Sequence, residues 1–172
     1  MNVLNIQNLK VLFRAGEGFV RAVEGVTITV GEGERVAIVG ESGCGKSVTS
    51  LACMRLLNTP PAYITADALT FVSKDGKTHD LLSKTETEML ALRAEEMAMI
   101  FQDPSTFLNP VMTIGEQLDE VFIYHMKMKK KEARRHSIEM MKKVGIPDPE
   151  MRAGQYPHEL SGGLKQRILI AM

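Results

Sequence analysis

The sequence predicts an α/β protein in which a β-rich first part is followed by a largely helical second part. Residues 3–13 and 22–30 are rich in Val, Ile and Leu with alternating stretches typical of strands. Residues 35–39 form a short apolar run that enters a glycine-rich turn, and residues 46–57 then carry apolar side chains at helical spacing. From Asp103 onward the pattern becomes mainly helical. We therefore expect an N-terminal antiparallel β subdomain, a strand–loop–helix unit and a helical subdomain.

Composition and charge exclude several classes of protein. The chain has 172 residues, of which 44% are hydrophobic and 24% charged, as in an ordinary globular domain. Lys plus Arg total 21 and Asp plus Glu total 21, so the net charge is zero and a nucleic-acid partner is not expected. No apolar run approaches the roughly 18 residues of a membrane-spanning helix, and the start does not resemble a secretory signal. The two cysteines, Cys44 and Cys53, suit a reducing compartment, so we expect a cytoplasmic location.

Two local signals follow the first helix. Residues 68–73, with Asp75 and Gly76 supplying turn chemistry, predict a β-hairpin. Ser83 with Glu86 matches a capping box, so we expect a short helix there, followed by a strand over residues 97–101.

The helical part contains a basic segment. Thr113 with Glu116 predicts a second capping box, at the start of a helix that reaches about Met126. Residues 127–135 then carry six basic side chains against one Glu. We interpret this segment as a solvated helix face, with a phosphate-binding or lipid-binding patch as the alternative.

The strongest chemical signal is a match to G-x-x-x-x-G-K-[ST] between the apolar run and the following helix. The matching residues are Gly40, Glu41, Ser42, Gly43, Cys44, Gly45, Lys46 and Ser47. Glycines let such a loop wrap its backbone N–H groups around an anion, and the start of the helix adds the positive end of its dipole. Lys46 would reach the β and γ phosphates of a nucleotide, and the Ser47 hydroxyl is suited to bind Mg²⁺. The segment therefore predicts a phosphate-binding loop.

A second anion-binding helix start is predicted far downstream, in residues 160–167. Ser161 would cap a helix while Gly162 and Gly163 leave its first N–H groups uncovered. Taken alone, this stretch is also consistent with a simple turn and cap.

The combination resembles the nucleotide-binding subunit of ATP-binding cassette (ABC) transporters, whose signature L-S-G-G-x-x-Q-R is matched by residues 160–167. Residues 99–104, M-I-F-Q-D-P, resemble the Q-loop of that family. The resemblance implies that the chain binds ATP and Mg²⁺, that Gln102 contacts the metal and the attacking water, and that Lys46 assists catalysis. It also implies a head-to-tail dimer, in which Ser161, Gly162, Gly163 and Gln166 face the nucleotide of a second such subunit.

Three segments are similar to the dipeptide, oligopeptide and nickel importer branch of the family. They are residues 40–50 with the unusual Val48, residues 101–117 and residues 156–167. This resemblance implies a peripheral protein on the inner face of the cell membrane that works with two membrane permease subunits and, indirectly, an external substrate-binding protein. It does not identify the transported substrate.

The family stacks the adenine base on an aromatic residue upstream of the phosphate loop, and Phe13 and Phe19 are the two candidates here. Either residue could instead belong to the core. His158 is expected to be structural, and the remaining histidines have no partners at the spacing of a zinc site.

The resemblance divides the chain into a β subdomain plus an incomplete RecA-like P-loop core, residues 1–102, and a helical subdomain, residues 103–172. The family would continue with a strand ending in Asp-Glu and with a switch histidine, so we interpret the chain as an N-terminal fragment and doubt that it hydrolyses ATP alone. A non-hydrolysing MgATP-binding interaction module is the alternative. A soluble ABC ATPase of DNA repair or translation is less consistent, because only 115 residues separate Lys46 from Ser161 and leave no room for long coiled-coil arms. An ordinary P-loop kinase would leave the signature unexplained.

Overall fold

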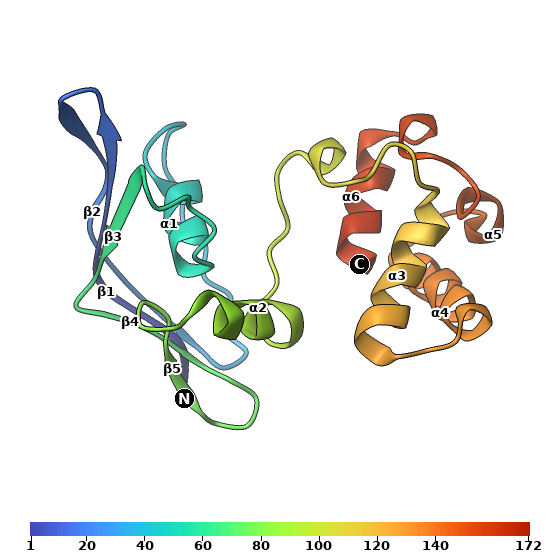
Figure 1. The fold of residues 1–172 in the computed structure, drawn as a ribbon, viewed down its shortest axis with the longest axis horizontal. Helices are drawn as coiled ribbons and strands as arrows, with labels where there is room; N and C mark the ends of the chain where they lie inside the picture. The colour runs from blue at the N-terminus through green and yellow to red at the C-terminus, as the bar shows by residue number, and fades with distance from the viewer. The chain divides into compact units, whose positions relative to one another are not determined.

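The computed structural model describes the backbone of all 172 residues and every side chain except that of Ser105. The chain forms two compact units, Met1–Ala98 and Met99–Met172 (Figure 1). Each unit has its own cluster of buried hydrophobic residues. The expected assignment of residues 1–102 and 103–172 to family subdomains stays a prediction.

The first unit is built on a five-stranded antiparallel sheet. Strands β1 (Asn2–Ala15) and β2 (Gly18–Gly31) form a long hairpin. The other edge of β1 is shared, because β4 (Ala68–Val72) pairs with its first half and β3 (Ala62–Thr65) with its second half. Strand β5 (Thr78–Asp80) completes a hairpin with β4. The α/β class, the antiparallel β subdomain and the hairpin after residue 68 are therefore confirmed.

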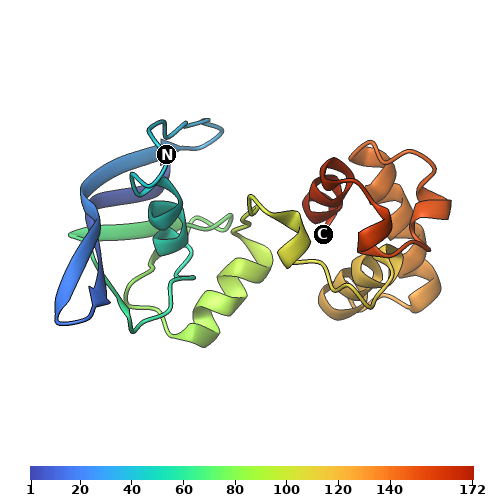
Figure 2. The same ribbon diagram turned by 90° about the horizontal axis from the view of Figure 1, so that it is seen from above.

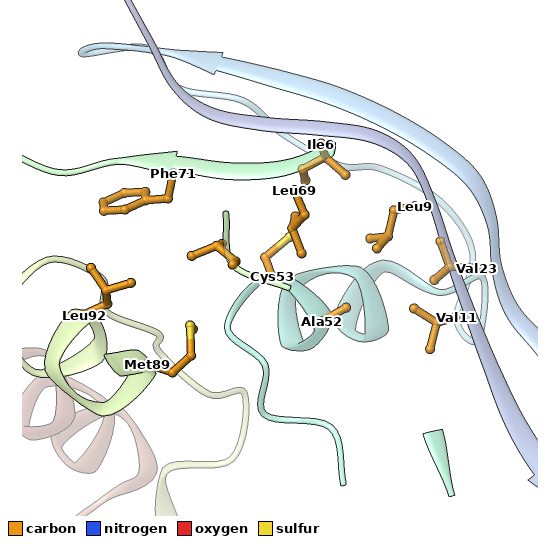
Figure 3. Packing of buried hydrophobic residues seen from close by; sticks show 11 residues of the cluster. Ile6, Leu9, Val11, Val23, Ala52, Cys53, Leu69, Phe71, Met89 and Leu92 are labelled. Atoms are coloured by element: carbon orange, nitrogen blue, oxygen red, sulfur yellow. The ribbon is translucent and has the colours of Figure 1, made fainter. Parts of the chain in front are cut away.

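Helices α1 (Lys46–Cys53) and α2 (Glu86–Glu95) pack against one side of this sheet (Figure 2). Figure 3 shows strand side chains directed at Ala52 and Cys53 of α1 and at Met89 and Leu92 of α2. The strand side chains in this cluster are Ile6, Leu9, Val11, Val23, Leu69 and Phe71. Each large aliphatic side chain that is fully buried contributes about 1.5–3 kcal/mol. This packing anchors α1, the helix that begins at the end of the phosphate-binding loop.

The strand expected over residues 35–39 does not form. The segment is irregular backbone, and it pairs with none of the five strands of the sheet. Val36 and Ile38 are each 44% exposed and Val39 is 91% exposed. An apolar run becomes a strand only when a neighbouring strand accepts its backbone hydrogen bonds, and within the described chain no strand lies beside this one. The expectation of a strand–loop–helix unit was therefore wrong for the strand.

Two other boundaries also differ from expectation. Residues 97–101 are irregular backbone and not a strand. Helix α1 ends at Cys53 and does not continue to residue 57, because Arg55 has the left-handed φ of 49° that commonly terminates helices.

The capping box of α2 lies two residues beyond the expected one. Thr85 is the N-cap, its hydroxyl accepts a hydrogen bond from the Glu88 N–H, and the Glu88 carboxylate accepts one from the Thr85 N–H. Ser83 instead donates to the carbonyl oxygen of Asp80, at 3.1 Å. Both pairs satisfy the same sequence pattern, and tertiary packing of Met89 and Leu92 selects the register.

The second unit is helical. Its helices are η1 (Pro104–Thr106), α3 (Ile114–Met126), α4 (Lys130–Lys143), α5 (Pro149–Arg152), η2 (Pro157–Glu159) and α6 (Gly162–Ala171). The expected Thr113–Glu116 capping box at the start of α3 is present, and α3 ends at Met126 as expected. No helix in the described part of the chain combines the length and the apolar character needed to cross a membrane.

A buried polar cluster joins α3 to α4. The Asp119 carboxylate, 3% exposed, accepts a hydrogen bond of 2.7 Å from the Ser137 hydroxyl and one of 2.8 Å from Arg134 Nε. Gly115 leaves room for that guanidinium, because a Cβ atom there would lie 2.8 Å from Arg134 Nη1. The contacts of Asp119 with Arg134 and Ser137 fix how α3 and α4 pack.

Candidate nucleotide-binding site

The phosphate-binding loop predicted at residues 40–47 leads directly into α1. Gly43 and Gly45 have φ values of 84° and 92°, which side chains other than glycine rarely adopt. Gly45 is also the N-cap of α1, and a Cβ atom on it would lie 2.4 Å from the carbonyl oxygen of Ala22 in β2. The loop therefore requires glycine at position 45 both for its backbone conformation and for its close approach to the sheet.

The start of α1 presents unpaired backbone donors. The first intrahelical bond runs from the Thr49 N–H to the Gly45 carbonyl oxygen, at 2.8 Å. The N–H groups of Lys46, Ser47 and Val48 precede it and have no intrahelical acceptor. These donors lie at the positive end of the helix dipole, so they can bind an anion such as a phosphate.

The Lys46 ammonium folds back over the loop. Its Nζ donates hydrogen bonds to the carbonyl oxygens of Gly40, at 2.8 Å, and Glu41, at 2.5 Å, and lies 3.4 Å from Cys44 Sγ. These contacts tie the Lys46 ammonium to the first two residues of the loop. A phosphate bound there would be held by a cation and by amide donors together.

The other loop residues divide into exposed and packed positions. Glu41, Ser42, Cys44 and Ser47 are exposed, whereas Val48 is half-buried and packs on the hydrophobic cluster of the first unit. The exposed Ser47 hydroxyl fits the role expected of a Mg²⁺ ligand. No group of three or more His, Cys, Asp or Glu side chains suited to a metal occurs among the described residues.

The signature segment lies in the second unit. Ser161 is the N-cap of α6, and its Oγ accepts a hydrogen bond of 3.4 Å from the Leu164 N–H. Gly162 and Gly163 are exposed, and a Cβ atom on either would meet nothing within 4 Å. Leu160 is buried below them and Gln166 is exposed. The predicted helix start is therefore present, with its first amides open to solvent.

Gln102 also belongs to the second unit, at a bend before η1, and is exposed. The neighbouring rings of Phe101 and Phe107 stack with centroids 3.9 Å apart. Thus the structure brings residues 40–47 together in one unit, and Gln102 and the signature in the other.

Comparison with known proteins identifies the group to which this chain belongs. A family model described as "ABC transporter" matches residues 23–172, which include both the phosphate-binding loop and the signature. The chain belongs to the ABC transporter family.

The chain is similar to ATP-binding proteins of peptide transport systems. It is 49% identical over 170 residues to the dipeptide transport ATP-binding protein DppD of Bacillus subtilis, covering 99% of this chain and 49% of that protein. It is 45% identical to the oligopeptide transport ATP-binding protein OppD of the same organism, covering 99% of this chain and 46% of that protein. The chain spans about half the length of the curated relatives it matches.

A solved structure with the same fold is a dimeric ATP-binding cassette, MJ0796, in a post-hydrolysis state bound to ADP and Pi. The TM-score is 0.79 at 24% sequence identity, and the match covers 98% of this chain and 67% of that one. At this identity the likeness supports the cassette fold.

The two candidate adenine-stacking residues of this ABC chain differ in exposure. Phe13 lies in β1 opposite Val20 of β2, and its half-buried ring packs on the first hydrophobic cluster. Phe19 is 57% exposed, and its ring makes an edge-to-face contact with Tyr63 of β3, with centroids 5.5 Å apart. Phe19 is therefore the more exposed of the two rings.

Two further residues, Gln117 and Arg167, position these segments through contacts that the sequence did not predict. Gln117 is buried, and its amide nitrogen donates to the carbonyl oxygens of Asn109 and Met112, at 3.0 Å each, so it holds the loop after Phe107. Arg167 Nη1 donates to the carbonyl oxygens of Val144 and Gly145 at the end of α4. Both residues lie within segments that carry the family resemblance, but their contacts with distant backbone could not be read from the sequence.

Proposed function

We propose that this chain binds MgATP through residues 40–47 and forms part of the ATP-binding subunit of an ABC importer for peptides or nickel. The observation that carries the proposal is the loop itself, in which one cation and the open amides of α1 converge at glycines with left-handed φ. Identity of 45–49% to peptide transport ATP-binding proteins supports the importer class.

Nucleotide binding would exchange the hydrogen-bond partners of Lys46. Its ammonium donates to the neutral carbonyls of Gly40 and Glu41 in the present structure. Charged phosphate oxygens are stronger acceptors than neutral carbonyls, so Lys46 would turn to the β and γ phosphates. The amides of residues 46–48 would bind the same phosphates, and either Phe19 or Phe13 would stack on adenine. Bound Mg²⁺, held by Ser47 and Gln102, would offset phosphate charge.

Assembly would use the second unit. In the proposed head-to-tail dimer, Ser161, Gly162, Gly163 and Gln166 face the nucleotide of the partner subunit. The open N-terminal amides of α6 would bind its γ-phosphate, so closure would depend on ATP. Two membrane permease subunits would contact the region of Gln102 on the inner face of the membrane, and an external binding protein would deliver substrate. Residues 1–102 and 103–172 would then be the core and helical subdomains.

ATP hydrolysis belongs to the whole transporter subunit in this proposal. The resemblance assigns the general base to a strand ending in Asp-Glu, and such a strand is not part of the five-stranded sheet described here. We therefore propose that residues 1–172 alone bind ATP without turning it over. The non-hydrolysing interaction module remains the second candidate function, supported by the same observation.

The decisive experiment measures equilibrium binding of fluorescent ATP with Mg²⁺ to the wild-type chain and to Lys46→Ala. Lys10→Ala is the matched control, because Lys10 is an exposed lysine with its side chain outside the loop. We expect binding to be lost only in Lys46→Ala. Equal binding by both variants would contradict the proposal. Phosphate release in the same samples tests what both candidates share, since appreciable turnover by this chain would contradict binding without hydrolysis.

A further inference from the structure

Three lysines lie at the junction of α3 and α4, here called the lysine tip: Lys127, Lys129 and Lys131. All three are exposed. Lys127 is the C-cap of α3 with a left-handed φ of 55°, and Lys129 is the N-cap of α4. Figure 1 shows this junction at one end of the second unit. The basic segment is therefore not a uniform helix face, because Lys127 and Lys129, two of its six cations, precede α4.

The other cations of the segment have acidic partners. Arg134 pairs with Asp119 and Arg135 lies 3.9 Å from Glu139. Lys130 shares a surface pocket with Glu116 and Glu120 on α3. Among the described side chains, no lysine of the tip forms an ion pair.

Lys129 and Lys131, at the start of α4, add little stability to the fold, whereas Lys127 lies at the negative end of the α3 dipole. Lys129 makes no side-chain capping hydrogen bond, and Glu132 is the one acidic residue in the first turn of α4. A cation at the N-terminal end of a helix opposes the helix dipole, and neighbouring lysines repel one another. When like charges lie together at a helix end without an ion-pair partner in the fold, we expect a binding partner from outside the chain to neutralise them.

Apolar and aromatic side chains accompany the lysine tip. Tyr124 and Met126, in the last turn of α3, are 67% and 60% exposed. Tyrosine beside lysines is the composition of surfaces at the boundary between lipid and water, where the ring enters the headgroup region and the ammonium groups bind phosphates. A nucleic-acid site would instead need a broad basic face, whereas this chain has zero net charge and acidic residues beside Lys130.

We infer that the lysine tip, with Tyr124 and Met126, is a docking surface for the anionic phospholipid headgroups of a membrane. Each lysine near an anionic bilayer strengthens association roughly fivefold. The contact requires no nucleotide, so it can be tested separately from ATP binding.

The test is co-sedimentation of the full 172-residue chain with vesicles, without nucleotide. One set of vesicles contains phosphatidylcholine alone, and the other has a third of it replaced by phosphatidylglycerol. We expect binding to the anionic vesicles only, weakening as salt is added. The triple variant Lys127→Gln, Lys129→Gln, Lys131→Gln should bind roughly a hundredfold more weakly.

A matched triple variant controls for net charge. Lys10→Gln, Arg14→Gln and Lys143→Gln remove the same charge from exposed positions elsewhere, and we expect vesicle binding close to wild type. Equal losses in both triple variants, or no preference for anionic vesicles, would overturn the inference. So would tighter binding of the wild-type chain to single-stranded RNA than to the anionic vesicles, lost in the lysine-tip variant, because that result identifies a nucleic-acid surface. Circular dichroism establishes that each variant is folded.

Discussion

Arg167 Nη1 donates a hydrogen bond of 3.2 Å to the carbonyl oxygen of Gly145, and a Cβ atom on that glycine would lie 2.5 Å from the same nitrogen. Gly145 has a φ of 73° and directly follows the C-cap residue of α4, Val144. The guanidinium thus binds the negative end of the α4 dipole and ties α6, which begins at the signature, to the body of the second unit.

We expect Gly145→Ala to destabilise the protein by about 2 kcal/mol. An alanine side chain is strained in this left-handed backbone conformation, and its Cβ would displace Arg167 from its carbonyl acceptors. Gly154→Ala is the control, because Gly154 lacks a positive φ and its added Cβ would meet only an ordinary contact at 3.4 Å. Urea unfolding measures the loss of stability in both variants. In the Arg167→Ala background the cost of Gly145→Ala should shrink but not vanish, and an unchanged cost would contradict the role of the contact.

The two glycines of the phosphate-binding loop should differ in their tolerance of alanine. At Gly43 an added Cβ meets nothing within 4 Å, so the cost is the backbone term alone, about 1–2 kcal/mol. At Gly45 the added Cβ would also lie 2.4 Å from the Ala22 carbonyl oxygen, so the start of α1 must move away from β2. We therefore expect Gly45→Ala to lower the urea midpoint clearly more than Gly43→Ala. Similar midpoints would show that the loop does not approach the sheet as described.

The Thr85–Glu88 capping box should make stability depend on pH. The Lys84 ammonium, followed by the Thr85 N–H and hydroxyl, lowers the pKa of Glu88 from 4.5 to about 2. A carboxylate with a depressed pKa in the folded state stabilises the fold above its unfolded-state pKa, and this contribution is lost as the pH falls toward the folded-state value. The difference in urea midpoint between wild type and Glu88→Gln should thus be constant at neutral pH and shrink from about pH 4.5 downward. A difference that grows on acidification would be inconsistent with the capping box.

The two cysteines should react very differently with thiol reagents. Burial raises the pKa of Cys53 to about 11, whereas Cys44 is exposed in the phosphate-binding loop. Because the thiolate is the nucleophile, Cys53 at pH 8 should react roughly a hundredfold more slowly than an ordinary exposed thiol. Mass spectrometry after brief alkylation should find the label on Cys44, and MgATP should protect it if residues 40–47 bind the nucleotide. Cys44→Ser then removes the rapid phase, and early labelling of Cys53 would contradict the buried core.

Several features were predictable because they depend on neighbours in sequence. The Thr113–Glu116 box, the Ser161 cap and the glycine-rich entry to α1 each involve contacts across a few residues. Their backbone requirements are local, so short patterns determine them. The same locality explains why the capping box was expected at Ser83 and Glu86. Ser83–Glu86 and Thr85–Glu88 both match the capping-box pattern, and only tertiary packing distinguishes them.

The amino-acid sequence by itself determined the helix caps, the loop glycines and the family of this chain, because these depend on residue types at fixed short spacings. Only the tertiary structure decided that residues 35–39 pair with no strand, that Lys46 reaches the carbonyls of Gly40 and Glu41, and that Arg167 binds the end of α4. Strand pairing and long side-chain contacts depend on which distant segments meet in space. That choice is set by the burial of hydrophobic surface over the whole unit, and no short pattern contains it.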